Sequence, residues 1–209
     1  MKKTVITIAR SYGSGGRTLG MLLADKLGIN CYDREILRMA SDESGINEAL
    51  FGEADEKLKK SPLLSILRKN PYKGGVIPPE SSDFVSDDNL FNYQAKVIKE
   101  LAEQESCIII GHLADYILKD DPDCIKVFIY APFEERVKMI AKKYQISEDE
   151  ARKVVRKMDQ SRSNFYTYYS NGKWEHGKGK DLILNRSTIS LEDCVEMIAH
   201  LVELKTKEK

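Results

Sequence analysis

Hydrophobic residues recur along the chain in two different patterns. Short, nearly continuous apolar runs alternate with longer segments in which apolar residues recur every three or four positions. The short runs indicate buried strands, and the longer segments indicate amphipathic helices. The predicted strands are Thr4–Ala9, Asn30–Tyr32, Cys107–Ile110, Ile125–Tyr130 and Leu182–Leu184. The predicted helices are Gly16–Leu27, Asn89–Gln104, Glu134–Tyr144, Glu148–Asn164 and Leu191–Lys205.

This alternation of strands and helices is typical of α/β proteins. The later strands are apolar at almost every position, as expected of parallel strands that are covered on both faces. The sequence therefore predicts a doubly wound, parallel, five-stranded sheet. Two helix starts carry their own signals: Ser147 with Glu150 forms a capping box, and Ser190 is an N-cap candidate.

Two segments depart from the alternation. Ser41–Asp88 is long, and its second half is rich in proline, glycine and serine, which indicates an insertion that closes over something. Phe165–Lys180 carries aromatic residues and glycines and is predicted to be a loop before the last strand. The 209 residues are enough for one domain with a sizeable core, so we expect residues 1–209 to form a single domain.

Composition limits the classes of partner. The chain has 33 Lys and Arg and 33 Asp and Glu, so its overall charge gives no argument for binding nucleic acid or a membrane surface. No apolar run approaches the length of a membrane-spanning helix. The four cysteines form no C-x-x-C pair and the three histidines are scattered, so we expect free thiols, no structural zinc and a reducing, cytoplasmic location.

A glycine-rich loop follows the first strand and precedes the first helix. This order builds a phosphate cradle, because loop N–H groups and the positive end of a helix dipole converge on one anion. The loop aligns with the phosphate-binding template G-x-x-x-x-G-K-[ST] through Ser11, Tyr12, Gly13, Ser14, Gly15, Gly16, Arg17 and Thr18. Gly16 and Thr18 match it, while Ser11 replaces the first glycine and Arg17 replaces the lysine.

An arginine still suits phosphate oxygens, and Gly13 and Gly15 are expected to supply the backbone freedom of the missing glycine. The alternative is a glycine-rich turn without a ligand.

Charged residues follow the second and third predicted strands. In an open α/β sheet, ligands bind at the carboxyl ends of strands. Asp33 and Arg34 could hold a sugar hydroxyl and a phosphate there, or could simply cap a helix and face solvent. His112 could contact a phosphate or a base, with a structural role as the alternative, and Asp115 lies one turn later. The carboxylate expected near Ile110 in many phosphate-binding loop proteins is absent.

The predicted helix Glu148–Asn164 carries four further candidates. Arg152, Arg156 and Asp159 line one face by helical spacing, and Arg162 falls close to the apolar side. An arginine that turns inward needs an anion or a buried partner. Together with the arginines of the loop and of the second strand end, these residues would provide the positive clamp that phosphoryl transfer needs. The alternative is an ordinary solvated helix.

These motifs together resemble the cytidylate kinase-like family of P-loop kinases over nearly the full length. The resemblance rests on Ala9–Arg17, Tyr32–Leu37, Ile108–Leu118, Asp159–Arg162 with Tyr168 and Tyr169, and Asp181–Asn185. It implies the fold of the P-loop nucleoside-triphosphate hydrolases and nucleoside monophosphate kinases. In that fold, residues 41–88 would be the acceptor-binding insertion and residues 147–180 the helical lid.

The resemblance also implies roles for individual residues. The loop Ser11–Thr18 would bind the donor phosphates, with the Thr18 hydroxyl on Mg²⁺. Catalysis would rest on Arg17, Asp159 and Arg162. The acceptor-binding residues would be Asp33, Arg34, His112, Asp115 and Arg156. The sequence departs from true cytidylate kinases at Arg17, where they carry lysine, and at Ile110–Leu113, where they carry Asp-Gly-Arg-Asp.

The resulting hypothesis is ATP-dependent phosphoryl transfer to a nucleoside monophosphate, CMP or dCMP in the first place, giving the diphosphate and ADP. Its partners would be ATP and a small phosphorylated acceptor. The alternative is a non-catalytic nucleotide-binding regulatory or sensor protein with a degenerate loop. Arg17 and the missing carboxylate at Ile110 support the alternative, whereas Thr18 and Arg162 speak against it.

Overall fold

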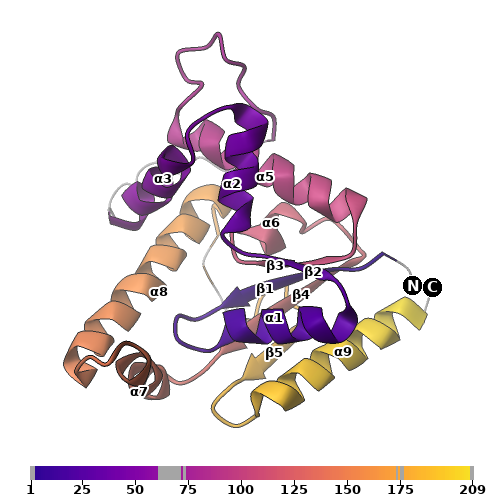
Figure 1. Cartoon of the computed structure of the whole chain (residues 1–209), viewed down its shortest axis with the longest axis vertical. Helices are drawn as coiled ribbons and strands as arrows, with labels where there is room; N and C mark the ends of the chain where they lie inside the picture. Colours follow the sequence, from indigo (N-terminus) through magenta and orange to yellow (C-terminus); the bar gives the residue numbers. More distant parts are fainter. Residues whose placement is uncertain (1–2, 61–71, 73, 173, 175–176, 208–209) are drawn as a thin grey trace. The chain divides into compact units, whose positions relative to one another are not determined.

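The computed structural model describes residues 3–60, 72, 74–172, 174 and 177–207 (Figure 1). The chain divides into two compact units. The first unit is built from Met1–Asp33, Glu105–Asp159 and Glu175–Lys209. The second unit is built from Arg34–Gln104 and Gln160–Trp174.

The first unit contains the sheet. Its strands are β1 (Val5–Arg10), β2 (Asn30–Tyr32), β3 (Cys107–Ile110), β4 (Cys124–Tyr130) and β5 (Leu182–Asn185). They are all parallel and lie in the order β2-β3-β1-β4-β5, which confirms the predicted sheet. Ile8 of β1 pairs with Ile110 of β3 and with Val127 of β4, so these strands end at the same edge.

Helices cover the sheet of the first unit on both faces. Helices α1 (Gly16–Leu27) and α9 (Leu191–Lys207) pack against each other and share one core with the strands. Ile6 and Ile8 of β1 point into this core, where they meet Leu19 and Leu23 of α1 and Ile198 of α9. The short helix α6 (Ala114–Ile117) contacts β1, and Figure 1 shows it on the opposite side of the sheet.

The capping signals of the sequence are confirmed. The Ser147 hydroxyl accepts the N–H of Glu150 at 3.3 Å, and the Glu150 carboxylate accepts the N–H of Ser147 at 3.1 Å. The Ser190 hydroxyl accepts the N–H of Asp193 at 3.0 Å. These caps begin α8 (Glu148–Ser170) and α9, and they satisfy backbone donors that a helix start otherwise leaves open.

The second unit is helical. It contains α2 (Glu35–Ser44), α3 (Glu48–Lys60), α5 (Asp87–Gln104) and the later part of α8. Helices α2, α3 and α5 contact one another. The Asn89 side chain ties residues 77–84 to the start of α5, accepting the N–H of Ile77 at 2.6 Å and donating to the Phe84 carbonyl at 2.7 Å. Residues 61–71 and 73 of the expected insertion 41–88 lie outside the described residues.

The predicted loop Phe165–Lys180 is wrong for its first part, because α8 continues to Ser170. Three aromatic residues of this stretch, Phe165, Tyr168 and Tyr169, recur at helical spacing and are buried. Tyr169 stacks on Phe91 of α5 with ring centroids 3.7 Å apart, and Phe165 meets Phe91 edge to face at 5.7 Å. Packing of these rings extends the helix beyond Asn164, its predicted end. Residues 173, 175 and 176 of the expected lid lie outside the described residues.

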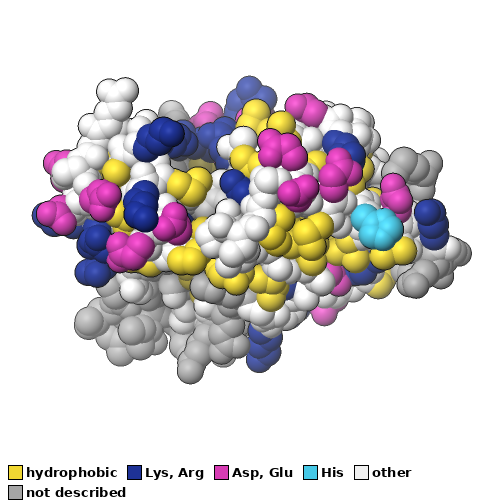
Figure 2. Space-filling view, turned by 90° about the horizontal axis from the view of Figure 1, so that it is seen from below, with side chains coloured by type: hydrophobic (Ala, Val, Ile, Leu, Met, Phe, Trp, Pro, Cys, Tyr) yellow, Lys and Arg dark blue, Asp and Glu magenta, His cyan; other side chains and the backbone are white. Residues whose placement is uncertain are grey.

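Charge is mixed on the surface. On the face seen in Figure 2, basic and acidic side chains are interspersed with hydrophobic ones. Within the described part of the chain, no helix combines the length and the apolar character needed to cross a membrane.

The four cysteines are free thiols, and three of them are buried: Cys107, Cys124 and Cys194. Burial raises the pKa of Cys107 to about 12 and that of Cys124 to about 11. Because the thiolate is the reactive form, we expect a thiol-reactive disulfide reagent at pH 8 to modify at most Cys31 in the folded protein and four thiols in denaturant. A Cys31→Ser variant should be unreactive while folded, and fast reaction of several thiols in the native protein would contradict this assignment.

Candidate active site

The glycine-rich loop has the backbone that its sequence predicts. Gly13 and Gly15 adopt left-handed φ values of 81° and 83°, and Gly15 is the N-cap residue of α1. Ser11 is not among the described non-glycine residues with positive φ, and its N–H donates to the Ile129 carbonyl at 3.0 Å. The loop therefore needs no glycine at Ser11, because Gly13 and Gly15 supply the turn.

Contacts beneath the loop hold it in place. The Ser14 hydroxyl donates to the carbonyls of Ser11 at 2.9 Å and Ile129 at 3.1 Å. A Cβ on Gly16 would lie 2.8 Å from the Cβ of Arg10, so only glycine fits where α1 starts against β1. The loop is thus fixed directly before the N-terminus of α1, where backbone N–H groups and the helix dipole favour an anion.

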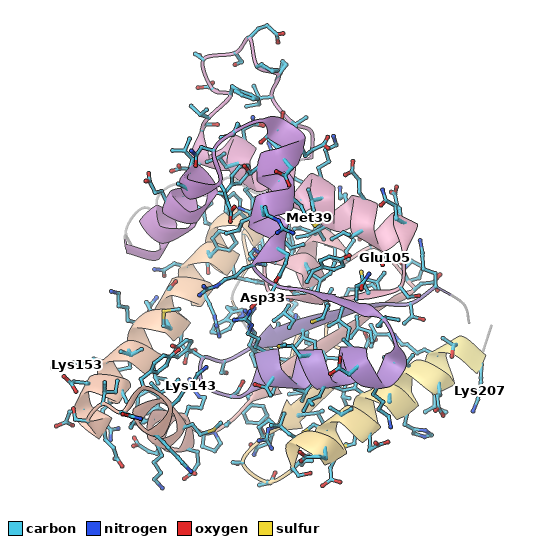
Figure 3. The ribbon with its side chains drawn as sticks, in the orientation of Figure 1. Asp33, Met39, Glu105, Lys143, Lys153 and Lys207 are labelled. Atoms are coloured by element: carbon cyan, nitrogen blue, oxygen red, sulfur yellow. The ribbon has the colours of Figure 1, made fainter. Side chains whose placement is uncertain are left out.

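Two arginines share the carboxylate of Asp33. Asp33, labelled in Figure 3, lies just beyond the end of β2. Arg17 Nε in the first turn of α1 is 3.1 Å from Asp33 Oδ2. Arg10 Nη2 at the end of β1 is 3.3 Å from Asp33 Oδ1. The structure therefore brings Arg17 of the loop together with Asp33, the predicted acceptor-binding carboxylate. It also places Arg10 beside Asp33, a residue that the sequence analysis missed.

Arg10 differs from Arg17 in its surroundings. The Arg10 side chain is 18% exposed, whereas that of Arg17 is 56% exposed. Burial lowers the pKa of the Arg10 guanidinium, the Asp33 carboxylate opposes this shift, and Arg17 adds to it. Arginine stays protonated in spite of such shifts, so Arg10 contributes a charge held away from water.

The end of β3 is shaped around Arg10. Gly111, His112 and Leu113 all have positive φ, at 81°, 51° and 53°. A Cβ on Gly111 would lie 1.8 Å from Arg10 Nη1, so the guanidinium occupies the space that a side chain would need. His112, at the centre of this turn, is half-buried. Strained backbone of this kind is costly and clusters at functional sites.

Asp115, a predicted acceptor-binding residue, forms an ion pair with Lys180 in the interior. Its side chain is 8% exposed and that of Lys180 is 5% exposed. Lys180 precedes β5, so the pair joins α6 to the start of the last strand. The Asp115 carboxylate also acts on Arg10, whose pKa it raises.

Removing one member of this pair is expected to destabilise the fold. Asp115→Asn leaves the Lys180 ammonium buried without its counter-ion, which costs about 3 kcal/mol or more. Urea denaturation should report that loss as a lower midpoint. The control is Lys26→Gln, which breaks an exposed pair with Glu196 and should change stability by less than about 1 kcal/mol. Equal effects of the two variants would contradict the buried-pair assignment.

Asp159 is tied to the loop directly and also through Arg136. Its carboxylate accepts the N–H of Tyr12 at 2.8 Å and Arg136 Nη1 at 2.6 Å. Arg136 also donates to the carbonyls of Tyr12 and Ala131, both at 2.9 Å. Arg136 belongs to α7 (Phe133–Tyr144) and was missed, although it lies four residues before the apolar Ile140 and so on the inner side of that helix.

The remaining arginines of the early part of α8 converge on Phe133. The guanidinium carbons of Arg152, Arg156 and Arg136 lie 5.7, 5.3 and 5.6 Å from the centre of its ring. This confirms that Arg152, Arg156 and Asp159 share a face of α8, since all three meet the start of α7 or the loop beside it. Arg152 also pairs with Glu134 and lowers the pKa of that carboxyl.

The last strand adds a third residue, after Arg10 and Arg136, that the sequence did not single out. Arg186 follows β5 directly, and its N–H donates to the Tyr130 carbonyl at 2.8 Å. Its Nε lies 3.8 Å from the point that a Cβ on Gly15 would occupy. The signal that could have found it is its position after a strand end, the same signal that selected Asp33.

Two predicted site residues belong to the second unit. Arg34 is the N-cap residue of α2 and is exposed. Arg162 lies on α8 and is half-buried, with buried Ser161 and Asn164 on either side along the helix. Their roles toward substrates stay predictions.

Comparison with known proteins agrees with the geometry of the loop and the sheet. The model of the cytidylate kinase-like family matches residues 5–188. The chain belongs to the cytidylate kinase-like family. Family membership confirms the prediction of a cytidylate kinase-like nucleoside monophosphate kinase.

Individual relatives are distant but match over most of their length. A cytidylate kinase of Methanobrevibacter smithii is 24% identical over 196 residues, which are 93% of this chain and 95% of that protein. A cytidylate kinase of Archaeoglobus fulgidus is 24% identical over 202 residues, which are 96% of this chain and 95% of that protein.

Solved structures show the same fold. An uncharacterized protein from Eubacterium ventriosum superposes with a TM-score of 0.69 at 22% identity, covering 96% of this chain and 99% of its own. Shikimate kinase from Bacteroides thetaiotaomicron has a TM-score of 0.55 at 16% identity, covering 96% of this chain and 98% of that one. These likenesses confirm the P-loop kinase fold of this cytidylate kinase-like protein.

The donor set of the loop fits a magnesium ion that arrives with phosphates. Thr18 is exposed in the first turn of α1, beside the loop, while Ile110 is buried and apolar. Among the residues that the structure describes, no group of three or more His, Cys, Asp or Glu could hold a metal. Mg²⁺ commonly keeps waters and binds through few protein ligands plus substrate phosphates, so Thr18 is the residue that would hold it.

Proposed function

We propose that this cytidylate kinase-like protein transfers the terminal phosphoryl group of ATP to a nucleoside monophosphate, with CMP or dCMP as acceptor. The products are ADP and the nucleoside diphosphate. The observation that carries the proposal is the 3.1 Å ion pair of Arg17 with Asp33, because it joins the phosphate-binding loop to the residue expected to face the acceptor. Relatives named cytidylate kinase support CMP as the first acceptor to test.

The reaction needs alignment and charge neutralisation, and no covalent intermediate. The loop Ser11–Thr18 binds the donor phosphates with backbone N–H groups at the start of α1. Arg17 neutralises charge on the β- and γ-phosphates, and Asp33 keeps its guanidinium oriented before the donor binds. Mg²⁺, bound with ATP, supplies further neutralisation of the phosphate oxygens.

Arg162 and Asp159 complete the proposed machinery. Asp159 orders the loop by accepting the N–H of Tyr12 and holding Arg136. Arg162 neutralises charge that spreads over the transferred phosphoryl group, as arginine fingers do in related reactions. Arg34, His112, Asp115 and Arg156 remain the proposed acceptor-binding residues beside Asp33.

An ADP-release assay over a panel of nucleoside monophosphates tests this proposal. We expect the highest kcat/KM with CMP or dCMP and no release without an acceptor. ATP binding with no release for any acceptor would instead support the non-catalytic regulatory or sensor protein. The free cysteines agree with a reducing compartment, and we propose a cytoplasmic location.

A further inference from the structure

Arg10 is an unusual residue for the end of a buried strand. It follows Ile6 and Ile8 at intervals of two, which places it on the side of β1 that faces the core. A charged side chain in such a place is costly unless it is paired and hydrogen-bonded, and Arg10 is held by Asp33. The fold nevertheless makes room for it, since Gly16 and Gly111 both leave out a Cβ that would collide with it.

The charges around Arg10 favour another anion. Arg10 and Arg17 share the carboxylate of Asp33, while Asp115 is paired with Lys180. These five groups are three cations (Arg10, Arg17 and Lys180) and two carboxylates (Asp33 and Asp115). Two guanidiniums thus lie beside a single shared carboxylate, and a guanidinium binds phosphate oxygens with two parallel hydrogen bonds.

The direction of the side chain indicates which phosphate it would bind. In the sheet order β2-β3-β1-β4-β5, Arg10 reaches from β1 over Gly111 at the end of β3 and to Asp33 beyond β2. It therefore extends toward the β2 side of the sheet, whereas Arg17 stands on the helix that begins at the phosphate-binding loop. The strained turn at His112 lies on the same side as Arg10.

We propose that Arg10 binds the phosphate group of the acceptor, so that Arg10 and Arg17 hold acceptor and donor phosphates on either side of Asp33. This inference rests on the proposed function and adds a specificity-determining residue to it. Asp33 holds both guanidiniums in place in the absence of substrates. The ligand class is a phosphate monoester, so the nucleoside without its phosphate is not recognised by Arg10.

Steady-state kinetics of Arg10→Gln, Arg10→Lys and Gly111→Ala test the proposal. Loss of a charged hydrogen bond should raise the KM for the acceptor about 10- to 100-fold in Arg10→Gln, with the KM for ATP within about twofold. Arg10→Lys should recover part of the acceptor affinity. Gly111→Ala keeps every charge but collides with the guanidinium, so it should weaken acceptor binding as well. Lys26→Gln, a surface charge change in α1, is the matched control and should change neither KM.

Equilibrium binding separates this inference from the proposed function. Titration with CMP and with cytidine measures the phosphate-dependent part of acceptor affinity even if the wild-type protein releases no ADP. We expect Arg10→Gln to weaken CMP binding and to leave cytidine binding unchanged, with circular dichroism confirming the fold. Equal loss for CMP and cytidine, loss confined to ATP, or no phosphate-dependent binding in the wild-type protein would each overturn the proposal.

Discussion

Arg17→Ala is expected to lower kcat/KM by about 10³-fold, a loss typical of removing one preorganised charged donor from a transition state. The guanidinium belongs to the first turn of α1 and pairs with Asp33, so its charge stands beside the loop that is proposed to bind the donor phosphates. Removing it leaves the developing charge on the phosphoryl oxygens without its cation. The measurement is ADP release with the best acceptor, together with ATP affinity by equilibrium titration.

Arg17→Lys is the matched control for that experiment. It keeps a point charge at the phosphates but loses the planar guanidinium that can bind two oxygens. A substantial part of the activity should therefore remain. If Arg17→Ala kept both turnover and ATP affinity, the side chain would serve only to pair with Asp33.

Arg162→Ala is expected to lower kcat by about 10³-fold while ATP binding changes little. Arg162 lies half-buried on α8, where helical spacing turns it toward the apolar side. In the proposed reaction, this guanidinium would neutralise charge on the transferred phosphoryl group. An interaction made mainly in the transition state lowers kcat and kcat/KM alike.

Lys153→Ala provides the comparison on the same helix. Lys153, labelled in Figure 3, is exposed, and its removal should leave both kinetic constants unchanged. A change in Arg162→Ala that is confined to KM would make Arg162 a residue of uniform substrate binding. No change at all would make its role structural.

Local patterns in the sequence predicted the sheet and the loop because those features depend on neighbouring residues. Apolar runs predicted the five parallel strands, and the glycine-rich loop before the first helix predicted the left-handed turn at Gly13 and Gly15. Ser147 and Ser190 predicted two helix starts correctly. Each of these signals lies within a few residues of the structure that it specifies.

Contacts between distant segments could not be predicted in the same way. Arg10 matters through Asp33 and Gly111, and Arg136 matters through Asp159, all of which are far from it in the sequence. The extension of α8 to Ser170 likewise depends on a ring stack with Phe91 of another helix. Tertiary packing decides such features, and hydrophobic periodicity carries no information on the partner.

The most direct test of the central claim is product analysis of one reaction containing the protein, ATP, Mg²⁺ and CMP. Anion-exchange chromatography separates ADP and CDP, so both products are counted in the same sample. We predict that ADP and CDP appear in equal amounts, that chelation of Mg²⁺ stops their formation, and that Arg17→Ala forms neither at a comparable rate. ADP without any nucleoside diphosphate, across the whole panel of acceptors, would contradict phosphoryl transfer to a nucleoside monophosphate.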